Sequence, residues 1–156
     1  MYVDARWTSI VYLTVQEEDI RLYRRLKAQN RLPLRVTMTW WHDASKPLEA
    51  LKAEIQSADF TTGTGDDWLR FGAFKINIDG GMTIGTAFQR APYGVFGRQL
   101  YGMTNPDDRG QLFESHEKLV AIMRTARDRN WQLSAHCQGG GAIDGFLDAL
   151  ETLDRE

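Results

Sequence analysis

The sequence alternates between segments with strand character and segments with helical periodicity, and this alternation is the strongest constraint on the fold. Residues 7–13 are β-branched and aromatic, and Glu17 then begins a helical pattern that stops near Asn30. Three further units follow: a strand at 34–40 with a helix after Ser45, a strand at 71–78 with a helix at 111–129, and a strand at 131–136 with a helix at 141–154. Four consecutive βα units predict an α/β fold with parallel strands.

Four βα units fit either a small doubly wound sheet or half of an eight-stranded (β/α)8 TIM barrel, and the pattern leaves both open. Residues 80–110, which follow the third strand, form a segment that is too long for an ordinary connection. We expect this segment to be a binding loop or lid over the carboxyl end of the sheet. The chain of 156 residues has the usual size of one domain, so we expect a single domain over residues 1–156.

Composition narrows the classes of partner. The net charge is −2 and charges of both signs are mixed along the chain, so we expect no nucleic-acid partner. No apolar run approaches the ~20 residues of a membrane span, so we expect no membrane association. Cys137 is the single cysteine, which excludes an internal disulfide and a cysteine-cluster zinc site. A reducing compartment fits this cysteine usage, and we expect a cytoplasmic protein.

Two of the strand segments carry a potential metal-binding group and end in a glycine-rich turn. Lys75 lies in the third strand and His136 ends the fourth. Chemistry in parallel α/β proteins collects at the carboxyl ends of strands. No other strand separates these two segments in the sequence, so we expect Lys75 and His136 to converge at neighbouring strand ends.

Lys75 has two interpretations: a metal-binding group within the sheet, or a lysine that reaches solvent. Strand alternation predicts that Phe71, Lys75 and Asn77 share one face and that Phe74 lies on the other. A lysine in mid-strand is unusual, because an unpaired buried ammonium is costly. The alternative is a lysine on an edge strand, with its amine extending to solvent.

Weaker candidates for substrate contact, or for support of the metal ligands, lie around the strand ends: Asp79, Tyr93, His42 and Gly139. Asp79 precedes two glycines, and it could equally be a turn former. Residues 139–141 are three glycines before a helix, an arrangement that can bind an anion through backbone amides. Neither the P-loop motif nor the dinucleotide fingerprint is present. No residue is assigned a catalytic proton or nucleophile role, Cys137 included.

The strand motifs and the segment between them resemble a known family. The chain reads Lys-Ile-Asn-Ile-Asp-Gly from Lys75, Thr-Ala at 86–87, Pro-Tyr at 92–93, and Ala-His-Cys-Gln-Gly-Gly-Gly-Ala-Ile-Asp from Ala135. This is similar to the middle of the metal-dependent amidohydrolases of the amidohydrolase-3 type, which include the N-substituted formamide deformylases. The resemblance runs from about Ser9 to Glu151, and it implies that the strands are the second to fifth of a (β/α)8 TIM barrel.

The resemblance implies a metal-dependent hydrolase that acts on a C–N bond in a small amide, formamide or cyclic amide. One or two divalent ions, with zinc expected, would activate a water molecule. Lys75, carboxylated by CO2, and His136 would be metal ligands. The chain departs from the family at Gly140, where an aspartate usually follows the first glycine of the turn.

The family also has metal-binding residues that this chain lacks. Its His-X-His pair after the first barrel strand, a later histidine and a later aspartate have no counterpart among the three histidines present here. We therefore expect an internal fragment with an incomplete site, which alone is a poor or inactive hydrolase. We expect it to associate with itself or with the missing barrel half. The alternative is a non-catalytic half-barrel that serves as a binding or assembly module, with an anion site at residues 139–141.

Overall fold

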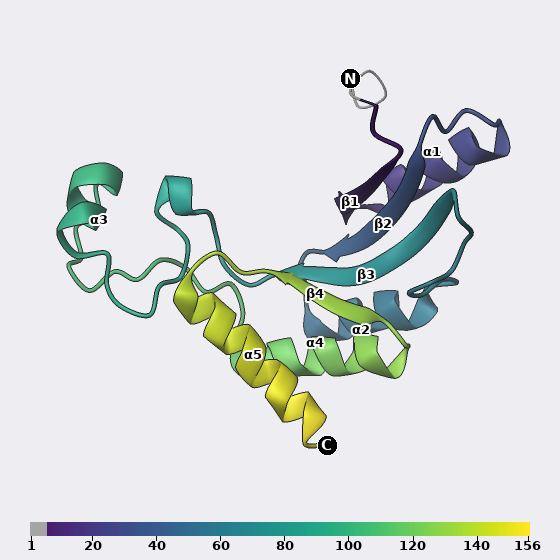
Figure 1. Ribbon diagram of the computed structural model, residues 1–156. Helices are drawn as coiled ribbons and strands as arrows, with labels where there is room; N and C mark the ends of the chain where they lie inside the picture. Colours follow the sequence, from purple (N-terminus) through teal and green to yellow (C-terminus); the bar gives the residue numbers. More distant parts are fainter. Residues whose placement is uncertain (1–5) are drawn as a thin grey trace. The chain divides into compact units, whose positions relative to one another are not determined.

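The computed structural model describes residues 6–156, in which four strands alternate with helices (Figure 1). The elements are β1 (Ser9–Val15), α1 (Glu17–Ala28), β2 (Arg35–His42), α2 (Leu48–Ser57), β3 (Leu69–Asn77), the 3-10 helix η1 (Met82–Ile84), α3 (Gly94–Tyr101), α4 (His116–Asp128), β4 (Gln132–His136) and α5 (Gly140–Asp154). The parallel strands form one sheet in the order β1-β2-β3-β4. The predicted α/β class is confirmed.

The chain divides into two compact units. The first contains residues up to His42 together with 53–75 and 125–134, and the second contains 43–52, 76–124 and 135–156. The sheet lies largely in the first unit, and the residues that follow β3 and β4 lie in the second. The candidate residues divide in the same way, because Lys75 belongs to the first unit while Asp79 and His136 belong to the second.

The boundaries of helix α1 are encoded locally. The amide of Gln16 donates to Asp19 Oδ2 at 3.1 Å, and the acidic first turn is favoured by the helix dipole. After the helix, Asn30 has a φ of 56°, a left-handed conformation that asparagine tolerates better than most residues. Asn130 follows α4 with a φ of 60°. The predicted stop near Asn30 is therefore confirmed.

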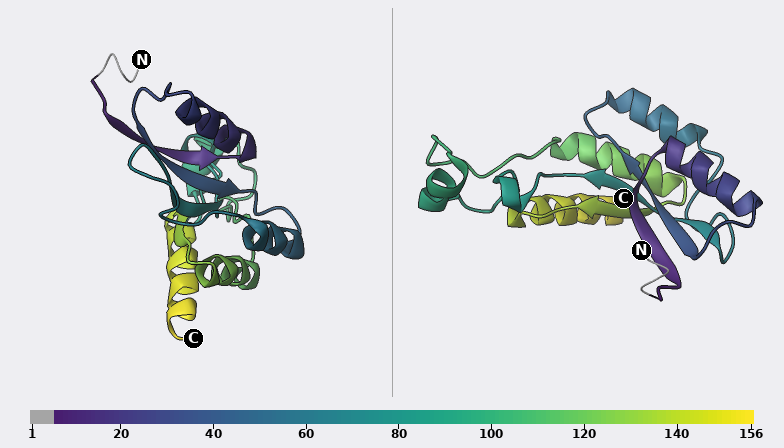
Figure 2. Two further views of the ribbon diagram at one scale, coloured as in Figure 1. Left: turned by 90° about the vertical axis from the view of Figure 1, so that its right-hand side faces the viewer. Right: turned by 90° about the horizontal axis from the view of Figure 1, so that it is seen from above.

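The described helices are short. The longest, α5, has 15 residues. Within residues 6–156, no helix is both long enough and apolar enough to cross a membrane. Figure 2 shows the helices and the sheet from two further directions.

The first unit has an aromatic interior. Its rings contact one another at centroid distances that include 3.9 Å between Phe60 and Phe71 and 6.3 Å between Trp40 and Phe74. We call this group the aromatic cluster: Trp40, His42, Phe60, Phe71, Phe74 and Trp131. Phe74 has no exposed surface, so its ring is held on all sides.

Strand β3 departs from simple alternation. Leu69 and Phe71 are buried, and after two half-buried residues the buried positions resume at Phe74 and Ile76. Phe71 and Phe74 both contact Trp131. The prediction that Phe71 shares a face with Lys75 is therefore wrong, because alternation is interrupted between Phe71 and Phe74.

The segment from 80 to 115 differs from the sequence prediction in two ways. Residues 80–110 contain η1 and α3. The sequence did not predict α3, because glycines at 94 and 97 lower its helix propensity. Helix α4 begins at His116 rather than near Gln111. The cause is tertiary: Leu112 pairs with Asp79 in an isolated bridge, and the Phe113 amide donates to the Ile78 carbonyl at 2.9 Å. These bonds hold residues 112–113 extended.

Candidate functional site

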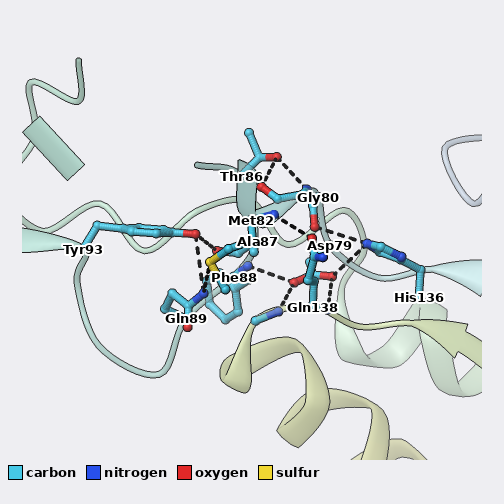
Figure 3. Close-up of polar contacts among 12 residues, drawn as sticks. Asp79, Gly80, Met82, Thr86, Ala87, Phe88, Gln89, Tyr93, His136 and Gln138 are labelled. Carbon is cyan, nitrogen blue, oxygen red and sulfur yellow. Dashed lines mark hydrogen bonds and ion pairs between the residues drawn. The ribbon is translucent and has the colours of Figure 1, made fainter. Parts of the chain in front are cut away.

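The second unit contains a buried carboxylate, Asp79, two residues after the end of β3. Its side chain accepts three backbone hydrogen bonds, from Phe88 (2.9 Å) and Gly139 (2.7 Å) at Oδ2 and from Gln138 (2.9 Å) at Oδ1 (Figure 3). Asp79 is 1% exposed, and a carboxylate is costly to bury unless donors surround it. Asp79 thus joins the segment after β3 to the turn after β4.

His136 lies at the end of β4, next to Asp79. Its Nε2 is 3.2 Å from the Gly80 carbonyl oxygen and 3.9 Å from Asp79 Oδ1 (Figure 3). A carbonyl can only accept, so the contact to Gly80 is a hydrogen bond when Nε2 carries the proton. This tautomer leaves the lone pair on Nδ1, and the described residues form no hydrogen bond to Nδ1.

Backbone amides at the start of helix α5 already donate hydrogen bonds to other residues of the chain. The Gly139 amide donates to Asp79, and the amides of Gly141 and Ala142 donate to the Phe88 carbonyl at 3.0 and 3.2 Å. Two of the three glycine amides that could have held an anion therefore already have acceptors. The geometry does not favour an anion site at residues 139–141.

Residues 86–93 and 108–111 are joined by hydrogen bonds, and we call this paired stretch the neck. The Gln89 amide donates to the Arg109 carbonyl at 2.7 Å, and the Tyr93 amide donates to the Asp108 carbonyl at 2.9 Å. At one end of the neck, the Gln111 amide donates to the Thr86 carbonyl at 3.0 Å. Helix α3 lies in the excursion beyond the neck, at residues 94–107.

Tyr93 is part of this support. Its hydroxyl donates to the Ala87 carbonyl at 2.8 Å (Figure 3). Its ring packs edge-on against Tyr101 at 5.6 Å. The hydroxyl therefore holds the segment, and substrate contact by Tyr93 stays a prediction. The use of residues 80–110 as a lid likewise stays a prediction.

One ion pair in the second unit was missed by the sequence interpretation. Arg90 forms two hydrogen bonds with Asp144 on α5, both at 2.7 Å. The bonds from Arg90 hold the pKa of Asp144 below its ordinary value. The two residues lie 54 positions apart, and no spacing rule connects them.

In the first unit, His42 lies in the interior rather than at a pocket wall. It is 4% exposed, its ring stacks on Phe74 at 4.7 Å, and its Nδ1 is 3.2 Å from Glu54 Oε2. These contacts place the ring within the aromatic cluster. Substrate contact by His42 stays a prediction.

Lys75 is half-buried in β3. Its strand lies between β2 and β4, so the interpretation as an edge-strand lysine is wrong. The described residues offer Lys75 no hydrogen bond or ion pair. The strands of Lys75 and His136 are neighbours in the sheet, as expected, but the two residues belong to different units. A shared site for their side chains stays a prediction.

Comparison with known proteins decides the family. The model of the amidohydrolase family matches residues 5–156. The chain belongs to the amidohydrolase family. A curated relative, "Putative amidohydrolase YtcJ" of Bacillus subtilis (strain 168), is 24% identical over 132 residues, which are 85% of this chain and 21% of the relative.

Two solved structures share the fold. One is an uncharacterized metal-dependent hydrolase from Pyrococcus horikoshii OT3, with a TM-score of 0.76 and 24% identity, and the match covers 97% of this chain and 28% of that one. The other is an uncharacterized metal-dependent hydrolase from Pyrococcus furiosus, with a TM-score of 0.73, 22% identity, and coverage of 97% and 29%. This amidohydrolase chain therefore spans less than a third of the length of the proteins that it matches.

The described residues of this chain do not bring together a complete metal site. Among residues 6–156, no group of three or more histidine, cysteine, aspartate or glutamate side chains is placed to hold a metal ion. A catalytic zinc site normally uses three protein ligands and an open position for water. Burial, and then the charge of Asp79, raise the pKa of Cys137 to about 11, so its thiol stays protonated at neutral pH.

Proposed function

We propose that this chain forms part of the catalytic domain of a metal-dependent hydrolase that acts on C–N bonds. The family match across residues 5–156 carries the proposal. The substrate class is a small amide, formamide or cyclic amide, and N-substituted formamides are one case within it. The names of the two solved relatives support the requirement for metal.

Within this proposal, Lys75 and His136 are the metal ligands that the chain supplies. Lys75 would react with CO2 as the neutral amine: the ammonium first releases one proton, and the nitrogen then bonds to the carbon while one C=O π bond of CO2 opens and a second proton leaves, so a cation becomes a carbamate anion. Lys75 lies half-buried on a strand between two others, where an unpaired ammonium is costly. His136 offers Nδ1. A divalent ion, with zinc expected, would supply an activated water, and at least one ligand beyond these two is required.

The ligand assignment predicts zinc uptake together with a carbamate signal. With zinc and ¹³C-bicarbonate, the 156-residue chain should show a carbamate resonance in ¹³C NMR spectra. Lys75→Ala should abolish that resonance, and His136→Ala should weaken zinc binding by at least about tenfold. His116→Ala is the matched control, because His116 is exposed at the start of α4.

Amide hydrolysis by this chain is expected to be slow or absent, because two ligands leave the ion incompletely held. Wild-type chain that takes up no zinc and shows no carbamate would contradict the assignment of Lys75 and His136. A chain that hydrolyses amides rapidly would show instead that its own residues complete the site.

A second function, assembly, is favoured by the surface of the first unit. Strand β1 stands at the end of the sheet order, and it carries Val11 and Leu13 at 60% and 56% exposure. Exposed apolar strands at a sheet edge recruit further chains. We propose that the 156-residue chain self-associates through β1.

Light scattering tests this proposal over a range of protein concentrations. The average mass should rise with concentration for the wild type, and Val11→Lys should lower it toward that of a monomer because a charge blocks edge pairing. Val95→Lys is the control, since Val95 is 69% exposed on α3 and distant in sequence from β1. A wild-type monomer at every concentration would refute self-association.

A further inference from the structure

The side chain of Asp79 does not bond to the backbone of its own turn. An aspartate that only forms an Asp-Gly turn bonds to the backbone within about two residues of itself. The three amides that Asp79 accepts lie 9, 59 and 60 positions away. The carboxylate therefore joins distant segments and does not form its own turn.

Two of those amides, at Gln138 and Gly139, lie two and three residues after His136. Gln138 and Gly139 are fixed from both oxygens of Asp79, so the backbone that leaves β4 has little freedom beyond His136. The Ile78 amide donates to the His136 carbonyl at 3.0 Å, which fixes the backbone at His136 itself. The position of this histidine is thus set from both sides by the two residues that follow β3, Ile78 and Asp79.

Asp79 and the residue after it also orient the imidazole of His136. The carbonyl of Gly80 faces Nε2, and Asp79 Oδ1 lies 3.9 Å from Nε2. A negative charge at this distance favours a proton on Nε2 over a lone pair there. The buried carboxylate and the adjacent carbonyl therefore act in the same direction on the ring.

We infer that Asp79 is a positioning residue for His136: its carboxylate clamps the turn after β4 and holds the imidazole as the Nε2–H tautomer against the Gly80 carbonyl. The purpose of this arrangement rests on the function proposed above, because His136 is the expected ligand. The arrangement itself involves only residues of the second unit.

Asp79→Asn tests the clamp at constant size. An asparagine side chain has one acceptor oxygen and one NH2 donor. With its oxygen in place of Oδ2, it keeps the bonds from Phe88 and Gly139, and its NH2 then faces the Gln138 amide. Hydrogen exchange at Gln138 should accelerate by at least about tenfold, while Phe88 and Gly139 change less. Equal acceleration at all three amides would overturn this arrangement of bonds.

The imidazole ¹⁵N spectrum gives the readout that a merely structural residue would not move. In the metal-free wild type at alkaline pH, His136 should be mainly Nε2–H, and in Asp79→Asn it should shift toward a mixture of the two neutral tautomers. Asp108→Asn is the matched control, because Asp108 accepts a single amide, that of Gly110, at 2.9 Å. An unchanged His136 spectrum in folded Asp79→Asn overturns the inference.

If Asp79→Asn does not fold, measurements on the wild-type chain alone test the inference. Scalar couplings across the hydrogen bonds should connect the amide nitrogens of Phe88, Gln138 and Gly139 to the Asp79 carboxylate carbon. Their absence, or a wild-type His136 that is mainly Nδ1–H, overturns the inference. These measurements use neither metal nor substrate. A chain that binds no zinc would refute the proposed function and leave the result for Asp79 standing.

Discussion

Replacing Gly139 by alanine is expected to destabilise the second unit by about 3 kcal/mol, near the upper end of the usual cost of overpacking. A Cβ at this position would lie 2.6 Å from the Phe88 amide nitrogen and closer still to its carbonyl group. These are backbone atoms, which cannot rotate away as a side chain can. Backbone torsion is not the cause, because Gly139 has a φ of −84°, which alanine adopts freely.

The measurement is urea unfolding followed by far-ultraviolet circular dichroism. Gly145→Ala is the control within α5, since a Cβ there meets no atom within 4 Å. Alanine in a helix interior should stabilise the chain by about 0.5–1 kcal/mol. If Gly139→Ala matched the wild type, the close approach of Phe88 to Gly139 would not exist in solution.

Phe74→Ala is the second large effect, and it falls on the first unit. We expect a loss of about 3–5 kcal/mol, the usual range for deleting a buried phenylalanine ring. Phe74 has no exposed surface, and its ring contacts Trp40, His42 and Trp131 in the aromatic cluster. The cavity would remain because three large rings cannot close it without losing contacts of their own.

Urea unfolding monitored by tryptophan fluorescence reports this change, since Trp40 and Trp131 border the ring. Phe96→Ala is the control, because Phe96 is 65% exposed on α3 and should change the stability by less than about 0.5 kcal/mol. A loss at Phe74 no larger than that at Phe96 would mean that the aromatic cluster is not packed as described.

The alternation of strands and helices could be predicted because it depends on local signals. Strand composition, helical spacing and the asparagine after α1 are properties of short windows. Two details failed where distant atoms decide them. Helix α4 starts late because Phe113 bonds to Ile78, and β3 breaks its alternation between Phe71 and Phe74. A short window contains neither cause.

The candidate site shows the same limit. The position of His136 at the end of its strand was predicted, since strand ends can be located from the pattern. The role of Asp79 stayed open between turn former and support, because two of its three partners lie 59 and 60 residues away. The burial of His42 was not predicted, because the end of a strand does not reveal whether a ring points into the interior.

The neck has a consequence for how proteins of this kind could diversify. The bonds of Gln89 and Tyr93 to Arg109 and Asp108 fix both ends of the excursion at residues 94–107. Once the ends are fixed, doubling the length of a flexible loop adds only about 0.6 kcal/mol of closure cost. We therefore expect residues 94–107 to tolerate changes in length at little cost in stability, provided that a ring remains to pack against Tyr93 as Tyr101 does. The strands, Asp79 and His136 lie outside this excursion.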